Sequence, residues 1–85
     1  MTHYIALVHK DADSSFGVQF PDVPGCFSAA DSMDDLVGNA MEALSLWAED
    51  EAMPARRTIE QIVADPDVAP ELLAGAFLIK LELSY

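Results

Sequence analysis

The chain has 85 residues and a mass of 9.2 kDa, which leaves room for one small domain and no second hydrophobic core. Hydrophobic residues make up 52% of it, so it is expected to fold despite a net charge of -11. Its four basic side chains are too few for a surface that neutralises phosphates or anionic lipid headgroups. Direct binding to nucleic acid is therefore not expected.

The cysteine content and the N-terminal residues indicate the cellular compartment in which the protein is expected. Cys26 is the only cysteine, which excludes an internal disulfide and a zinc site made of four thiolates. Residues 1–8 form too short an apolar run for a secretory signal, and no window approaches the roughly 20 apolar residues of a membrane-spanning helix. We therefore expect a cytoplasmic protein without a membrane partner.

The first third of the chain predicts a three-stranded meander. Residues 2–8 are mostly aromatic, branched or large, which is typical of a strand covered on both faces. A polar turn over residues 10–15 precedes residues 16–20, where apolar side chains alternate with Gly and Gln. After a bend rich in Pro and Gly, residues 26–30 can form a short third strand.

A long helix follows the meander. Ser32 and Asp35 have the spacing of a capping box, which predicts the start of the helix. Apolar residues then recur at spacings of three and four as far as Trp47, and acidic residues occupy the other sectors. We expect this helix to end near Glu51, with Trp47 as a core anchor.

The remaining residues predict two short helices and a last strand. Thr58 and Gln61 form a second possible capping box, and residues 70–74 predict a further helical turn with Gly75 as its C-terminal cap. Residues 76–83 show the clearest period-two alternation in the chain. They predict the final strand.

Together these elements predict an α+β fold, a β-β-β-α-β two-layer sandwich with sheet order 3-2-1-4. A helical crossover usually returns a strand parallel to its neighbour, so we expect the last strand to lie parallel to the first. In this order the last strand is an exposed edge with apolar side chains, which a second chain commonly covers. Self-association as a dimer or tetramer is therefore expected.

Candidate catalytic residues are sparse. His3 and His9 lie roughly 20 Å apart on a straight strand, too far to share a metal. Cys26 stands beside a Pro-Gly bend without a nucleophile signature, and such a cysteine is usually a packed apolar residue. The first strand carries no acid and the last strand only Glu82, which weighs against a hydrolase that holds Mg²⁺ or Mn²⁺ with carboxylates. No cofactor is expected, and a remnant metal-dependent hydrolase stays open as an alternative.

Several segments carry a family pattern. These are residues 4–8, the run 16–26, residues 30–32 and the helix through 39–47. The most specific part is the Pro-Asp-x-Pro-Gly-Cys sequence between the second and third strands. In these residues the chain resembles the HicB-type antitoxin domain, over almost its whole length.

This resemblance implies a partially degraded ribonuclease-H-like fold and a non-enzymatic antitoxin. Its partner would be a HicA-type toxin, a small basic ribonuclease that acts on messenger RNA, neutralised by tight complex formation. Family members commonly carry a DNA-binding segment after the last strand; we expect residues 1–85 to be a single HicB-like domain without one, and without direct DNA binding. An orphan oligomeric domain without a toxin is the other alternative.

The motif and the acidic residues supply the candidate site. The two prolines and the glycine of the motif set a turn, and its aspartate can hydrogen-bond local amides. The motif residues are Pro21, Asp22, Pro24, Gly25 and Cys26. The residues predicted to make charge contacts with a basic toxin are Asp22, Glu42, Glu49, Asp50 and Glu51.

Overall fold

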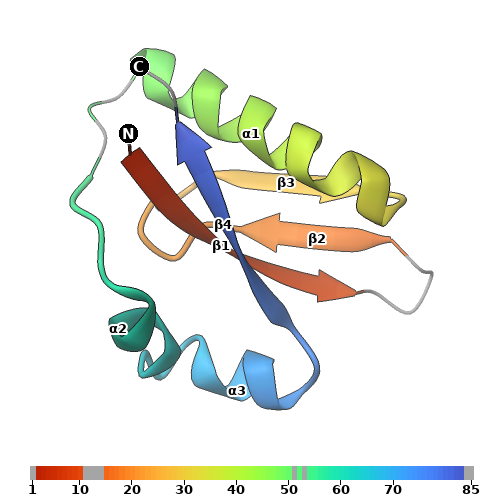
Figure 1. Cartoon of the computed structure of the whole chain (residues 1–85), viewed down its shortest axis with the longest axis vertical. Coiled ribbons are helices and arrows are strands. Elements are labelled where there is room, and N and C mark those ends of the chain that lie inside the picture. The colour runs from red at the N-terminus through yellow and green to blue at the C-terminus, as the bar shows by residue number, and fades with distance from the viewer. Residues whose placement is uncertain (1, 11–14, 51, 53, 84–85) are drawn as a thin grey trace.

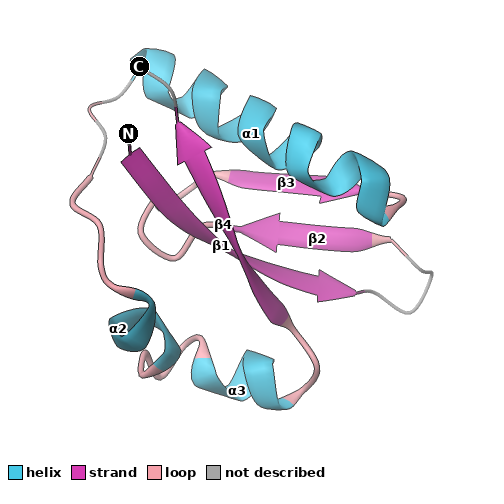
Figure 2. Ribbon diagram, viewed as in Figure 1, coloured by secondary structure: helices cyan, strands magenta, loops and turns pink. Residues whose placement is uncertain are grey.

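A computed structural model of the chain describes residues 2–10, 15–50, 52 and 54–83. The predicted elements are all present, with ends shifted by at most two residues (Figure 2). They are β1 (Thr2–Lys10), β2 (Phe16–Gln19), β3 (Phe27–Ala30), α1 (Met33–Asp50), α2 (Ile59–Val63), α3 (Ala69–Leu73) and β4 (Phe77–Leu83).

The strands form one sheet in the order β3-β2-β1-β4, which confirms the predicted order and the α+β class. The prediction that β4 runs parallel to β1 is wrong. The two strands are antiparallel, with Thr2 opposite Leu83 and Val8 opposite Phe77. The physical reason is the long connection after α1, which carries the chain back along the molecule to the other end of β1 before β4 begins (Figure 1).

The helix α1 covers one face of the sheet, and together they form the predicted two-layer sandwich. Leu36, Ala40 and Leu44 are fully or almost fully buried on the inner side of the helix. They pack in one cluster with Tyr4, Ala6 and Val8 of β1 and, as predicted for a core anchor, with the half-buried Trp47. This cluster is the main hydrophobic core.

The short helices α2 and α3 lie on the opposite face of the sheet (Figure 1). Ile62 and Val68 form a second cluster there with Ile5 and Leu7 of β1. Successive strand residues point to opposite faces, so Ile5 and Leu7 face these helices while their neighbours face α1. This explains why β1 is apolar on both sides.

The capping box predicted at Thr58 is complete, whereas the one predicted at Ser32 is present in part. Thr58 accepts from the backbone N–H of Gln61, and the Gln61 side chain accepts from the backbone N–H of Thr58. At α1, the Asp35 amide donates to Ser32 Oγ over 3.3 Å, whereas the Asp35 carboxylate accepts from the Ser32 hydroxyl. Aspartate is one methylene shorter than glutamate, which accounts for this contact. Gly75 follows α3 at φ 107°, the left-handed conformation expected of a C-terminal cap.

Gly38 has the lowest intrinsic helix propensity of the residues in α1. It is exposed, and a Cβ added there would meet no atom within 4 Å. We therefore expect Gly38→Ala to raise the free energy of unfolding by about 1 kcal/mol, because alanine loses less backbone entropy in a helix. Urea denaturation checks this. An unchanged or lower stability would mean that Gly38 serves a purpose the isolated fold does not show.

Candidate protein-binding site

The Pro-Asp-Val-Pro-Gly-Cys motif forms a tight turn between β2 and β3. The Val23 amide donates to the Phe20 carbonyl and the Cys26 amide donates to the Val23 carbonyl. Gly25 has φ 85°, which side chains with a Cβ rarely adopt. The apolar side chains of Phe20, Val23 and Cys26 are buried in the main core. The motif is therefore the structural turn that the sequence predicted.

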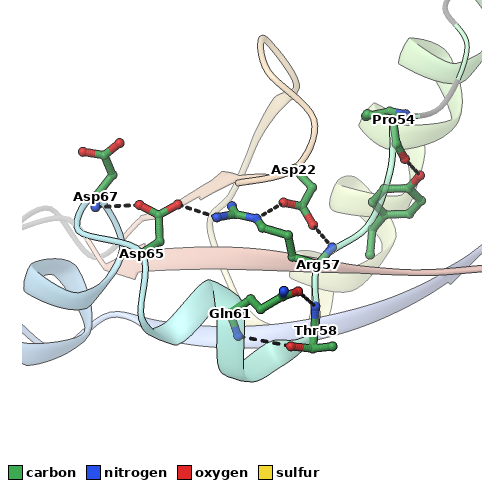
Figure 3. Close-up of polar contacts among 8 residues, drawn as sticks. Asp22, Pro54, Arg57, Thr58, Gln61, Asp65 and Asp67 are labelled. Carbon is green, nitrogen blue, oxygen red and sulfur yellow. Dashed lines mark hydrogen bonds and ion pairs between the residues drawn. The ribbon is translucent and has the colours of Figure 1, made fainter.

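The aspartate of the motif makes a long-range contact. Asp22 Oδ1 accepts from Arg57 Nε over 2.6 Å, and Asp22 Oδ2 accepts from the Arg57 backbone amide over 2.8 Å (Figure 3). The prediction that Asp22 bonds local amides is wrong, because its partner lies 35 residues further along the chain. The Asp22 side chain is only 6% exposed, so the contact with Arg57 offsets part of the cost of removing its carboxylate from water.

Arg57 also reaches a second carboxylate. Its Nη1 donates to Asp65 Oδ2 over 2.7 Å, and Asp65 Oδ1 accepts from the Asp67 amide (Figure 3). The hydrogen bond from Arg57 is the main cause that lowers the pKa of Asp65, followed by the one from the Asp67 amide. The turn of the motif, the segment after α1 and the loop after α2 are thus joined through one guanidinium group.

The segment after α1 has further anchors to β1. The Tyr4 hydroxyl donates to the Pro54 carbonyl, and Arg56 Nη1 donates to the His3 carbonyl over 3.5 Å. Burial raises the pKa of Tyr4, which keeps its hydroxyl protonated as a donor. These contacts set the path that leads from α1 to α2.

The outer face of α1 is acidic and partly apolar. The helix contains five carboxylates and no basic residue. Met33, Val37 and Leu46 are half or more exposed on the same helix. Exposed apolar side chains among charges of one sign are typical of a surface that binds another protein.

A shallow groove of about 320 Å³ runs between α1 and β3. The Asn39 side chain donates to the Ala29 carbonyl over 2.9 Å and thereby joins the helix to the strand. Glu42 is exposed at the groove. The lining residues are Ser28, Ala29, Asn39, Glu42, Ala43 and Leu46. We call this groove and the outer face of α1 the acidic helix surface.

The residues predicted to contact a toxin do not all lie on one surface. Glu42 and Glu49 are exposed on α1, and Asp50 is its last residue. Glu51 lies outside the described residues. Both oxygens of Asp22 are engaged by Arg57 within the chain. The structure thus brings Glu42 and Glu49 onto the acidic helix surface and places Asp22 in the support of the turn.

Sequence reasoning missed two kinds of residue. Arg57 and Asp65 were not singled out, and their distance in sequence from Asp22 leaves no local spacing that would reveal them. Leu46 lies outside the apolar stripe of α1, and its position at the groove depends on how β3 packs beside the helix. An apolar residue in an otherwise polar helix sector was the one available signal for it.

Possible metal ligands and the single thiol are the side chains of the described residues that bear on catalysis. In the described part of the chain, no three His, Cys, Asp or Glu residues are grouped so that they could hold a metal ion. Cys26 is a buried, packed residue as predicted, and burial raises the pKa of its thiol, which disfavours the nucleophilic thiolate. The described residues thus offer a surface for binding.

Comparison with known proteins places the chain in a family. A family model described as "HicB_like antitoxin of bacterial toxin-antitoxin system" matches residues 4–84. The chain belongs to the HicB-like antitoxin family. This membership confirms the resemblance inferred from the motif and the helix.

Relatives of this HicB-like chain include a phage protein and solved antitoxin structures. An uncharacterized 14.9 kDa protein of Haemophilus phage HP1 is 40% identical over 63 residues, which cover 68% of this chain and 47% of that protein. The chain thus spans about half the length of that relative.

Two solved structures share the fold. The N-terminal domain of the Burkholderia pseudomallei antitoxin HicB is 29% identical with a TM-score of 0.79, covering 99% of this chain and 100% of that one. A chain of a structure described as the HicA3 and HicB3 toxin-antitoxin complex is 27% identical with a TM-score of 0.75, again covering 99% and 100%. The fold is therefore that of HicB antitoxin domains.

The role of Arg57 is tested by Arg57→Met. This change removes the guanidinium partner of the buried Asp22 carboxylate and leaves it the backbone amide of residue 57, and breaking a buried ion pair costs about 3–5 kcal/mol. Arg57 itself is 35% exposed, and solvent screening reduces the expected loss of stability to about 2 kcal/mol. Urea denaturation measures it, with Arg56→Met as the matched control because Arg56 makes a single long contact, of 3.5 Å, to the described residues. Equal losses in the two variants would contradict the role of Arg57.

The free energy of unfolding is predicted to depend on pH through the carboxylate of Asp65. The pKa of Asp65 is lowered from its usual 3.8, so its contribution to stability is fully present above that value and is lost as the pH falls through the lower folded-state value. The stability difference between wild type and Asp65→Asn should therefore shrink as acid is added in this range. Asp67→Asn is the control, because Asp67 contacts Asp65 through its amide alone. A difference that stays constant through the acid range would contradict the ion pair.

Proposed function

We propose that this chain is an antitoxin that binds and neutralises a small, basic HicA-type toxin by direct contact. The observation that carries the proposal is the family match over residues 4–84. It is supported by the likeness to a chain in a structure described as a toxin-antitoxin complex. Family membership and this structural likeness together support a HicA-type toxin as the partner.

The charge of the chain is consistent with such a partner and favours one surface. The net charge is -11, and α1 alone carries five carboxylates without a neighbouring base in the helix. Complementary charge accelerates association and disfavours wrong partners, while exposed apolar side chains supply contact area. We place the toxin on the acidic helix surface, with Glu42, Glu49, Asp50 and Glu51 as charge contacts and Leu46 as an apolar contact. Asp22 acts indirectly, by linking the motif turn to the segment after α1 through Arg57.

The proposed mechanism is occlusion without catalysis. A bound antitoxin that covers a ribonuclease's substrate-binding surface stops the reaction by excluding RNA, and this requires tight binding and no chemistry from the antitoxin. The buried thiol of Cys26 and the separated histidines of the described residues fit this assignment. The hydrolase alternative has no assembled site in the same part of the chain.

Two further proposals concern the context of the protein. We propose that residues 1–85 form one domain that acts through protein contact and does not bind DNA directly, in keeping with its scarcity of basic residues. Among the residues that the structure describes, no helix combines the length and apolar character needed to cross a bilayer. We propose the cytoplasm as the site of action, where messenger RNA and its ribonucleases meet.

The proposal is tested with a HicA-type toxin as the binding partner. Wild-type protein should form a complex and rescue growth of cells that express the toxin. Glu42→Lys and Glu49→Lys should each weaken binding by about tenfold, mainly through slower association, because each replaces an attractive charge by a repulsive one. Calorimetry and stopped-flow mixing measure the two effects.

Glu60→Lys is the matched control for these variants. Glu60 is also exposed, and the substitution changes the charge by the same amount on α2, away from the acidic helix surface. It should leave toxin binding unchanged. The absence of both a complex and growth rescue would overturn the antitoxin proposal and favour an orphan oligomeric domain. Equal effects of all three substitutions would overturn the proposed location of the interface.

A further inference from the structure

Nothing in the described part of the chain requires a glycine at position 38. Residues two apart in a helix lie about 200° apart around its axis, so Gly38 lies nearly opposite the buried Leu36 and Ala40. It is exposed, and a Cβ added there would meet no atom within 4 Å. Its φ is not positive, unlike that of Gly25 and Gly75. The two usual needs for glycine, a close approach and a left-handed backbone, are therefore not met within the chain.

This glycine lowers the stability of the free chain. Glycine loses more backbone entropy in a helix than any other residue, and α1 runs unbroken through position 38 from Met33 to Asp50. Gly38 therefore marks neither an end nor a break of the helix. A residue that opposes its own local structure, without a compensating contact in the chain, is typical of a functional site. The compensating contact can then lie in a complex.

The missing side chain at Gly38 leaves a notch in the outer face of α1. Asp34 lies one turn before the notch and Glu42 one turn after it, and both are exposed. Positions four apart are neighbours on a helix surface, about 5–6 Å apart. Side chains in a helix lean toward its N-terminus, which directs Glu42 toward the notch and Asp34 away from it.

Glu42 is available to a partner at this place. In the part of the chain that the structure describes, its carboxylate forms no ion pair. Glu42 also lines the groove between α1 and β3, so the notch lies one helical turn from that groove. A side chain that enters the notch therefore meets exposed backbone below it and an unpaired carboxylate beside it.

We propose that Gly38 determines specificity for the toxin by admitting one of its lysine or arginine side chains into the notch. The alkyl chain of this basic residue packs over the exposed helix backbone, and its charged end pairs with Glu42. The inference rests on the proposed function, which supplies a basic partner and places it on the acidic helix surface. A methyl group at position 38 holds the basic side chain away from the helix and weakens both contacts.

A competing explanation is that Gly38 persists without a function. Natural proteins are rarely at their stability optimum, so a single unfavourable helix residue can be tolerated. That explanation predicts that replacing Gly38 makes the chain more stable and leaves toxin binding unchanged. The notch predicts that the gain in stability is accompanied by a loss of affinity, and these opposite signs separate the two explanations.

The test measures the stability of Gly38→Ala and its affinity for the HicA-type toxin side by side. Urea denaturation should show a gain in stability. Calorimetry should show a dissociation constant raised about tenfold, because the added methyl group clashes with the inserted side chain. Gly38→Gln, which also introduces a better helix former, should raise the constant further. Since both variants are expected to be more stable than wild type, unfolding does not account for weaker binding.

Gly17→Ala is the matched control, since a Cβ added at Gly17 also meets no atom within 4 Å. Its neighbours Phe16 and Val18 lie in the main core beneath α1. Successive strand residues point to opposite faces, so position 17 faces away from α1. The same methyl group there should leave toxin binding unchanged.

A double-mutant cycle tests whether the inserted side chain is basic. Glu42→Gln should weaken toxin binding more in the wild-type chain than in Gly38→Ala, because the filled notch has already displaced the side chain that pairs with Glu42. Equal losses in the two backgrounds would overturn the pairing of a basic side chain with Glu42 in the notch.

The outcomes separate this inference from the proposed function. A wild-type chain that does not bind the toxin would overturn the proposed function, and the inference with it. A wild-type chain that binds, together with unchanged affinity in Gly38→Ala and Gly38→Gln, would overturn the notch alone. A loss of affinity that Gly17→Ala reproduces would overturn it as well, because the effect would then not be specific to α1.

Discussion

The arrangement of the second half of the molecule depends on the guanidinium group of Arg57. It stands between the buried carboxylate of Asp22 and the carboxylate of Asp65, at 2.6 Å and 2.7 Å. One partner belongs to the turn of the motif and the other to the loop after α2. The α2 residue Ile62 then covers Leu7 on the face of the sheet that α1 leaves free. A small domain has few apolar residues for such a second cover, so a directional polar contact has a large share in fixing its position.

The same contact gives a physical reason for an aspartate in the motif. The prolines and Gly25 suffice to set the backbone of the turn. The aspartate adds the link between this turn and a segment far away in the sequence. Because its side chain is only 6% exposed, the carboxylate is stable there as long as Arg57 is present. The motif is thus a turn and an anchor together.

Local signals predicted most of the fold. The capping box at Thr58, the cap hydrogen bond at Ser32, the cap at Gly75 and the alternation along β4 all act within a few residues, and each is found in the structure. The direction of β4 was predicted wrongly because it depends on the path of the whole segment from Pro54 to β4, which contains two short helices instead of one crossover helix. No local pattern encodes that path.

The candidate site, like the fold, was predictable where it depends on a local sequence pattern. The acidic sector of α1 follows from helical periodicity, and Glu42 and Glu49 are exposed there. The groove beside β3 and the position of Leu46 in it required the packing of helix against sheet. The pairing of Asp22 with Arg57 required the tertiary fold as well, since 35 residues separate the two.

The central claim is that a HicA-type toxin binds the acidic helix surface. Heteronuclear NMR of the isotope-labelled chain, titrated with the unlabelled toxin, tests it most directly because it reports on every backbone amide at once. The account predicts that the largest shifts fall on the outer residues of α1 and on the groove beside β3, around Glu42, Leu46 and Glu49. Shifts confined to α2, α3 and β4, with α1 unperturbed, would contradict it.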